Sequence, residues 1–231
     1  MGPALERLEK VAEALGPLCD QMVFVGGAIT ELLITDKAMP PPRTTLDVDC
    51  TVEVTSRVAY YSLEEKFRQL GFTSDANDPP IMCRWMIQKI TVDIMPTLED
   101  ILGFSNIWYT DAIKQAQMLT LSGGENIRVI TAPWFIATKT EAFISRGKEN
   151  FFSSHDFEDM LYLVNSRPEL IEEIYRAPRH MYNSISERWQ SYLKHPDLKG
   201  AVQAHVDAYE TVSRSAIVIE RLEKMFTTGG T

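Results

Sequence analysis

Thr44-Thr45-Leu46-Asp47-Val48-Asp49 is the most informative run of residues in this chain, and it comes shortly after Phe24-Val25-Gly26-Gly27. From residue 46, apolar and polar side chains alternate: Leu46, Val48, Cys50 and Val52 against Asp47, Asp49, Thr51 and Glu53. Because side chains of a strand alternate between its faces, Asp47 and Asp49 are predicted on one face, roughly 7 Å apart. Such a pair supplies the hard oxygen ligands that Mg²⁺ prefers and leaves room for phosphate oxygens.

A third carboxylate fits the same scheme. Residues 90–95 read Ile-Thr-Val-Asp-Ile-Met, which predicts another strand with Asp93 opposite in phase to its apolar residues. If this strand lies beside the first, three carboxylates converge, and such like charges are tolerated mainly when cations neutralise them. The alternative is that each aspartate belongs to the solvated face of a half-exposed strand.

The glycine pair Gly26-Gly27 follows a short apolar strand predicted over residues 21–25. Glycine lets the backbone turn tightly or approach a ligand closely. Residues 28–34 then predict a short helix, whose N-terminus would offer free N–H groups to an anion. An ordinary tight turn explains the same two residues equally well.

Composition sets broad limits. The chain has 231 residues, of which 45% are hydrophobic, as is usual for packed globular proteins. It shows neither an apolar run of membrane-spanning length nor a signal-peptide pattern, so we expect a cytoplasmic protein with no membrane partner. Cys19, Cys50 and Cys83 match no zinc or disulfide pattern and are expected to be reduced core thiols.

A net charge of −9 argues against a general nucleic-acid coating protein, although residues 176–199 are locally basic. Tyr182, Trp189 and Tyr192 interleave with these basic residues. The mixture is compatible with RNA contact through phosphate pairing and base stacking. An amphipathic helix with aromatic core anchors would look the same.

The predicted fold class is α/β (α+β), a small mixed-sheet domain followed by a helical bundle. The change of character near residue 125 predicts a domain over residues 1–125 and a helical domain over 126–231. Two further strands joined by a hairpin around Gln88-Lys89 are predicted within residues 82–95. In the second half, helical patterns cover residues 134–145, 156–165, 168–175, 182–192 and 200–226.

A second group of polar residues lies in the helical half. Taken alone, Lys139 is expected to be a partly exposed helix lysine whose loss leaves stability almost unchanged. Asp156 and Asp159 are three residues apart and share a helix face. Capping of the helix N-terminus also explains Asp156, and His155 is expected to be a turn or capping residue.

These segments occur in the following order along the chain: Val25-Gly26-Gly27-Ala28-Ile29, Arg43-Thr44-Thr45-Leu46-Asp47-Val48-Asp49, Val92-Asp93, Ala137-Thr138-Lys139-Thr140-Glu141-Ala142-Phe143-x-x-Arg146-Gly147-Lys148 and Asp156-x-x-Asp159. Over residues 20–165 the combination resembles the AbiEii-like toxin nucleotidyltransferases of type IV toxin–antitoxin systems, in the DNA polymerase β-type superfamily. The glycine turn and the Asp-x-Asp are common to the superfamily. The Lys139 and Asp156 segments point to the toxin branch.

The resemblance implies a role for each matching residue. Gly26, Gly27 and Arg43 would hold the nucleotide, and Lys139 would meet its triphosphate. Metal ligation would fall to Asp47, Asp49 and Asp93, with Asp93 also as base or bridge, and Asp156 would complete the site from the helical domain. The chain departs from the common pattern in having Gly-Gly rather than Gly-Ser at the turn, and His155 where arginine is frequent.

The implied activity is a Mg²⁺- or Mn²⁺-dependent transfer of a nucleoside monophosphate from a nucleoside triphosphate (NTP) to an acceptor hydroxyl. The acceptor implied by the toxin branch is tRNA or another RNA, and a cognate antitoxin is an implied partner. The alternatives are a non-catalytic nucleotide-binding relative, or nucleotidylation of a protein or of a small molecule such as an antibiotic.

Overall fold

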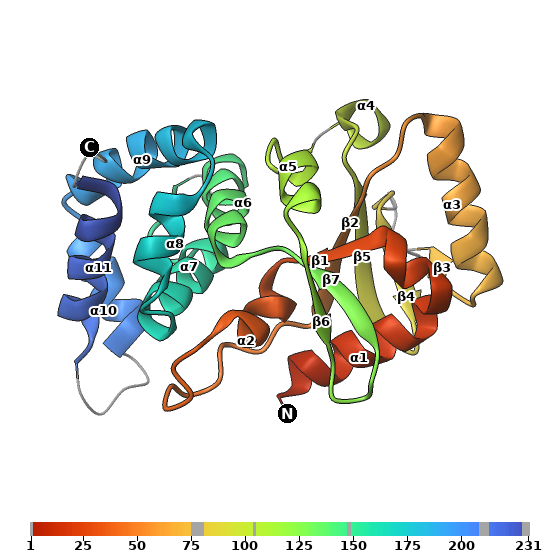
Figure 1. Cartoon of the computed structure of the whole chain (residues 1–231), viewed down its shortest axis with the longest axis horizontal. Coiled ribbons are helices and arrows are strands. Elements are labelled where there is room, and N and C mark those ends of the chain that lie inside the picture. Colours follow the sequence, from red (N-terminus) through yellow and green to blue (C-terminus); the bar gives the residue numbers. More distant parts are fainter. Residues whose placement is uncertain (1, 75–80, 104, 147–148, 208–212, 228–231) are drawn as a thin grey trace. The chain divides into compact units, whose positions relative to one another are not determined.

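The structure is a computed structural model that describes residues 2–74, 81–103, 105–146, 149–207 and 213–227 (Figure 1). The chain forms two compact units. A sheet unit contains residues 1–31 and 43–131, and a helical unit contains residues 32–42 and 132–231. The sequence predicted a domain boundary near residue 125. The strand formed by residues 126–129, which follows this point, still pairs within the sheet.

The sheet unit is built on seven strands in the order β3-β4-β5-β2-β1-β7-β6. Their bounds are β1 Met22–Val25, β2 Asp47–Val52, β3 Thr73–Ser74, β4 Arg84–Ile87, β5 Ile90–Pro96, β6 Gln117–Thr120 and β7 Asn126–Val129. The pairs β2–β5 and β1–β7 are parallel, and the other pairs are antiparallel. The predicted mixed sheet is therefore confirmed.

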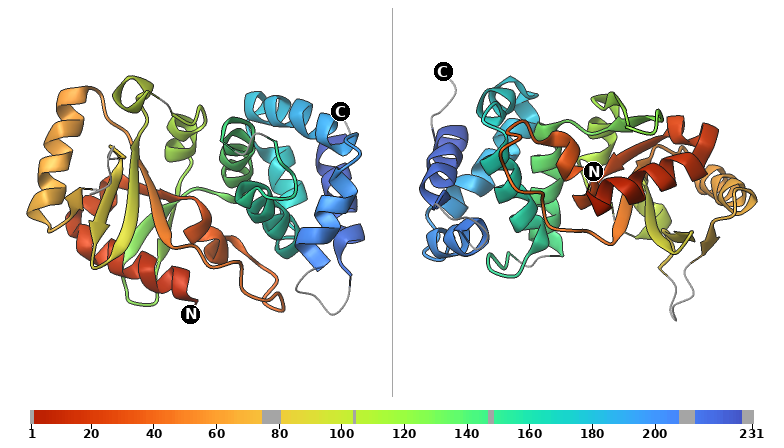
Figure 2. Two further views of the ribbon diagram at one scale, coloured as in Figure 1. Left: turned by 180° about the vertical axis from the view of Figure 1, so that it is seen from behind. Right: turned by 90° about the horizontal axis from the view of Figure 1, so that it is seen from below.

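Two long helices cover apolar parts of this sheet. Helix α1 (Pro3–Leu15) buries Leu8, Val11 and Leu15, and in Figure 2 it runs across one face of the strands. Helix α3 (Arg57–Gln69) lies beside β3 and β4, where the ring of Phe67 meets that of Trp85 at 5.3 Å between centroids. The shorter elements are η1 Gly16–Gln21, η2 Gly27–Ile29, α2 Thr30–Leu33, α4 Glu99–Leu102 and α5 Tyr109–Lys114.

The hairpin predicted around Gln88-Lys89 is present between β4 and β5. Gln88 and Lys89 have positive φ angles of 48° and 67°. Two successive residues with positive φ form the turn whose twist suits a two-residue hairpin. The turn sets the pairing register, in which Ile87 faces Ile90 and Arg84 faces Asp93.

The alternation predicted for the first aspartate strand holds only in part. Val48, Cys50 and Val52 are buried, but Leu46 lies before β2 and is 75% exposed. Thr51, expected on the polar face, is fully buried, and its hydroxyl donates to the carbonyl of Met95 at 3.0 Å. The alternation of apolar and polar residues therefore predicts burial correctly only within β2, and only where the polar face of that strand is open to solvent.

The helical unit contains six helices among its described residues: α6 Ala132–Ser145, α7 His155–Ser166, α8 Leu170–Arg176, α9 Arg179–Leu193, α10 Leu198–Val206 and α11 Ser215–Thr227. The predicted bundle is confirmed. Helix α6 buries residues around its whole circumference, as expected for a central helix. The single helix predicted over residues 200–226 is wrong, because α10 and α11 are separate and the Asp207 carboxylate accepts hydrogen bonds from the N–H groups of Arg214 and Ser215.

Residues 32–42 pack with the helical unit although they precede β2 in the chain. The N–H groups of Thr35 and Asp36 donate to the carbonyl of Ser166 at 3.2 and 2.9 Å, and the Tyr162 hydroxyl donates to the carbonyl of Pro40. The segment leaves the sheet unit after Glu31 and returns to it at Arg43. The loop between the glycine turn and the Asp-x-Asp strand is thus anchored on α7.

The aromatic residues of the basic segment are core anchors. Tyr182, Trp189 and Tyr192 are buried, and the Trp189 indole stacks on Phe226 at 5.2 Å between centroids. Its N–H donates to the Thr140 hydroxyl at 3.1 Å. The interpretation of these rings as the core anchors of an amphipathic helix is therefore confirmed.

The cysteines and the lengths of the helices bear on two expectations from composition. Cys19, Cys50 and Cys83 are buried free thiols, as predicted. Within the part of the chain that the structure describes, no helix is long and apolar enough to cross a bilayer.

Candidate metal centre

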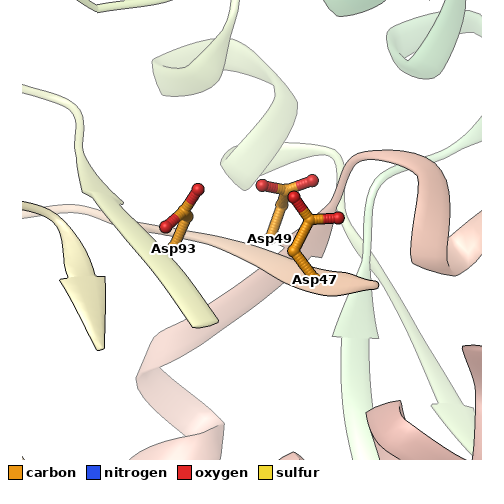
Figure 3. A group of neighbouring side chains, drawn as sticks. All are labelled: Asp47, Asp49 and Asp93. Carbon is orange, nitrogen blue, oxygen red and sulfur yellow. The ribbon is translucent and has the colours of Figure 1, made fainter. Parts of the chain in front are cut away.

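Two parallel strands bring the three predicted carboxylates together. Strand β2 lies beside β5 with Asp49 directly opposite Asp93, and Asp47 is two residues earlier on β2. One carboxylate oxygen from each of Asp47, Asp49 and Asp93 lies within 4.8 Å of the other two. Figure 3 shows the three side chains projecting from the same face of these strands. The predicted convergence is confirmed.

The chemistry of the neighbouring groups leaves oxygen as the donor atom. Cys50 follows Asp49 on β2, and burial raises the pKa of its thiol well above 9.0. Burial likewise raises the pKa of Cys83, next to Arg84, to about 11. Thiols in this state are poor metal ligands because the thiolate is the coordinating form. The three half-buried carboxylates offer hard oxygen ligands, and this donor set fits Mg²⁺ or Mn²⁺.

Gly26 shapes the edge of the centre. It has φ 71° and ψ −167°, a conformation that residues with a side chain rarely adopt. A Cβ atom placed on Gly26 would lie 1.9 Å from Oδ2 of Asp49 and 2.8 Å from its Cβ. The backbone of the turn therefore lies directly against the Asp49 side chain, and no larger residue fits. Gly27 is buried and begins η2.

Replacing Gly26 by alanine should displace Asp49. We expect Gly26→Ala to weaken Mn²⁺ binding at least tenfold, because the added methyl group and a ligand oxygen would need the same space. The matched control is Gly16→Ala, where φ is also positive, at 51°, but nothing lies within 4 Å of the added atom. Mn²⁺ titration should show native affinity for the control. Equal Mn²⁺ affinity in Gly26→Ala and Gly16→Ala would show that Gly26 does not shape the metal centre.

Arg84 is a residue of this centre that the sequence analysis did not single out. Its Nε donates to Oδ1 of Asp93 at 2.8 Å and its Nη2 to Oδ2 at 2.7 Å. Both oxygens of the third carboxylate thus accept a hydrogen bond from one guanidinium. Arg43, which the resemblance assigned to the nucleotide, is half-buried on the segment that enters β2.

Lys139 and Asp156 lie together in the helical unit. The Lys139 ammonium donates to Oδ1 of Asp156 at 2.9 Å and to Oδ2 of Asp159 at 2.7 Å, and all three residues are buried. The Arg146 guanidinium forks onto Asp156 at 2.9 and 2.8 Å. The expectation of a partly exposed Lys139 is therefore wrong. Gly147 and Lys148, which complete the motif, lie outside the described residues.

The opposite charges of Lys139 and Asp156 stabilise each other's ionised forms. Burial alone would lower the pKa of Lys139, but Asp159 and Asp156 outweigh it and raise that pKa above 10.5. Burial alone would raise the pKa of Asp156, but hydrogen bonds from Arg146 and the charge of Lys139 lower it from 3.8 to about 2.

The start of α7 shows what caps this helix. The Ser154 hydroxyl accepts a hydrogen bond from the N–H of Phe157, so Ser154 is the N-cap. Asp156 is not the cap, because its carboxylate faces Lys139 and Arg146. His155 is the first residue of α7, and its Nδ1 lies 3.2 Å from Oε2 of Glu158.

The lowered pKa of Asp156 predicts a loss of stability in acid. A group whose pKa is lower in the folded state stabilises the protein above its unfolded pKa, and that contribution disappears as the pH falls. A drop from 3.8 to about 2 corresponds to roughly 2 kcal/mol, lost between about pH 4 and pH 2. Urea unfolding across pH 5 to 2 should show a flatter pH dependence for Asp156→Asn than for the native chain. The exposed Asp197→Asn should follow the native curve, and parallel curves for all three would contradict the assignment.

No protein-family model matches this chain, and no curated protein sequence is significantly similar to it. A mixed sheet that carries three clustered aspartates on neighbouring strands is consistent with a DNA polymerase β-like fold.

Proposed function

We propose that this protein is a metal-dependent nucleotidyltransferase that moves a nucleoside monophosphate from an NTP to an acceptor hydroxyl. The observation that carries the proposal is the meeting of Asp47, Asp49 and Asp93 within 4.8 Å. The close approach of the Gly26 backbone to Asp49 supports it, because the turn holds this carboxylate in place beside the other two.

The three carboxylates would hold one or two divalent cations, which neutralise phosphate charge and lower the pKa of the attacking hydroxyl. The acceptor oxygen forms a bond to the α-phosphorus, the bond between the α- and β-phosphates breaks, and pyrophosphate leaves. The hydroxyl proton passes to a carboxylate oxygen of the site or to water. Asp47 and Asp49 project from a single strand, while Asp93 joins them from β5.

The acceptor in this proposal is RNA, with tRNA ends first, and the biological role is that of a type IV toxin with a cognate antitoxin. The resemblance of the Lys139 and Asp156 segments carries this finer assignment.

One observation favours a second candidate, a nucleotide-binding relative without transferase activity. Lys139, the expected triphosphate contact, has its ammonium between Asp156 and Asp159.

Two measurements test the proposal. Calorimetry with each NTP, with and without Mn²⁺, reports binding. Incubation with α-labelled NTPs and either total tRNA, cell protein or an aminoglycoside reports transfer and identifies the acceptor class. Label on tRNA supports the full proposal, and label on another acceptor keeps the chemistry but replaces the substrate. NTP binding without transfer to any acceptor favours the binding relative, and absence of both metal and NTP binding contradicts the nucleotidyltransferase.

A further inference from the structure

A row of charged groups crosses three neighbouring strands at the metal centre. In the pairing register, Arg84 of β4 lies opposite Asp93 of β5, and Asp93 lies opposite Asp49 of β2. Residues directly opposite each other on paired strands project from the same face. Arg84 therefore stands on the carboxylate face of the sheet, on the side of Asp93 away from Asp49.

The contact between Arg84 and Asp93 is a two-pronged one. Nε and Nη2 donate to the two different oxygens of the carboxylate, at 2.8 and 2.7 Å. The side chains are 28% and 14% exposed, so solvent screens the pair less than it would a surface ion pair. A planar guanidinium that binds both oxygens fixes the direction and the plane of the carboxylate, which a lysine ammonium does not.

Asp49 and Asp93 are held in different ways. Asp49 is confined by the Gly26 backbone, which approaches its Oδ2 and its Cβ. Asp93 comes from another strand and faces two like charges, which favour a rotation of its carboxylate away from Asp49. The fork from Arg84 binds both oxygens of Asp93 and so fixes the orientation of its carboxylate beside these like charges.

We propose that Arg84 is a positioning residue of the metal centre, which holds Asp93 in the orientation that completes the carboxylate triad. The proposal rests on the function proposed above, in which the triad binds a divalent cation. Partners of metal ligands commonly contribute tenfold to a hundredfold to metal affinity by orienting the ligand. The positive charge of Arg84 would act in the opposite direction, since it repels a divalent cation, and the two effects can be separated by mutation.

Mn²⁺ binding followed by electron paramagnetic resonance separates them. Arg84→Lys keeps the charge and loses the fork, whereas Arg84→Gln loses both. We expect each to weaken Mn²⁺ binding at least tenfold. The matched control is Arg167→Lys, because Arg167 forks onto Glu173 with two contacts of 2.7 Å in the helical unit. This control should bind Mn²⁺ like the native chain.

Native affinity in Arg84→Lys would overturn the proposal, since the fork would then be unnecessary. Tighter binding in Arg84→Gln would also overturn it, because Arg84 would act only as a competing cation. Absence of Mn²⁺ binding by the native protein is a different result, which contradicts the proposed function itself.

A second measurement guards against a variant that is merely misfolded. If Arg84 acts through Asp93, then Arg84→Lys should have little further effect on Mn²⁺ affinity in a chain that already carries Asp93→Glu, which keeps a carboxylate ligand but displaces it from the Arg84 fork. Effects of the two substitutions that add fully would contradict the proposal. Melting temperatures of the four chains show whether each one is folded during the titration.

Discussion

Asp49→Asn should abolish measurable Mn²⁺ binding and reduce nucleotidyl transfer by on the order of a thousandfold, about 4 kcal/mol of transition-state stabilisation. Asp49 is the central carboxylate, since it shares β2 with Asp47 and lies opposite Asp93. An amide of the same size keeps the contact with Gly26 but removes the negative charge and one oxygen ligand. The fold should persist, because relief of repulsion among three carboxylates offsets lost interactions.

Glu53→Gln is the matched control for this substitution. Glu53 follows β2 in the same alternating pattern of acidic residues, yet it is exposed and does not belong to the carboxylate cluster. The control should keep native Mn²⁺ affinity and native turnover. Transfer activity within threefold of native in Asp49→Asn would show that the triad is not the catalytic centre.

Lys139→Met should destabilise the protein by roughly 3–5 kcal/mol. The substitution leaves two buried carboxylates without their shared cation, and Asp159 loses the ammonium that lies 2.7 Å from its Oδ2. Arg146 still pairs with Asp156. This result would reverse the sequence-based expectation that loss of Lys139 hardly changes stability.

Urea unfolding measures the effect as a lower transition midpoint at an unchanged slope. The control is Lys224→Met, because Lys224 forms an exposed pair with Glu220 one helical turn away, and exposed pairs contribute little to stability. Adding Asp159→Asn to Lys139→Met should recover part of the loss, since it removes a buried charge. A midpoint for Lys139→Met equal to that of Lys224→Met would contradict a structural role. NTP affinity, measured on Lys139→Met while it is folded, tests the triphosphate contact separately.

Local patterns were sufficient for the carboxylate strands. The alternation around Asp47 and Asp49 and the phase of Asp93 both depend on the two-residue repeat of a strand, which is a property of the backbone. Arg84 could also have been found in this way. Counting outward from the Gln88-Lys89 turn places it opposite Asp93, as the pairing register has it.

The burial of single residues was harder to predict from the sequence, because it depends on which segments cover a residue. Leu46 reads as a core residue but is exposed, and Thr51 reads as polar but is fully buried. Likewise, the rings of Tyr182, Trp189 and Tyr192 fit a base-stacking surface as well as a core until α9 is packed against its neighbours. A periodic pattern identifies a face of an element without identifying what that face contacts.

The sequence by itself determined a half that contains strands followed by a helical half, the glycine turn and the three aspartates in phase, since each follows from backbone periodicity and glycine stereochemistry. Only the tertiary structure decided that β5 lies beside β2, that Arg84 donates hydrogen bonds to Asp93, and that Lys139 is buried between Asp156 and Asp159. These are contacts between residues distant in the chain or on different elements. Their energies depend on distance, solvent exclusion and neighbouring charge, and the order of residues in a chain specifies none of these directly.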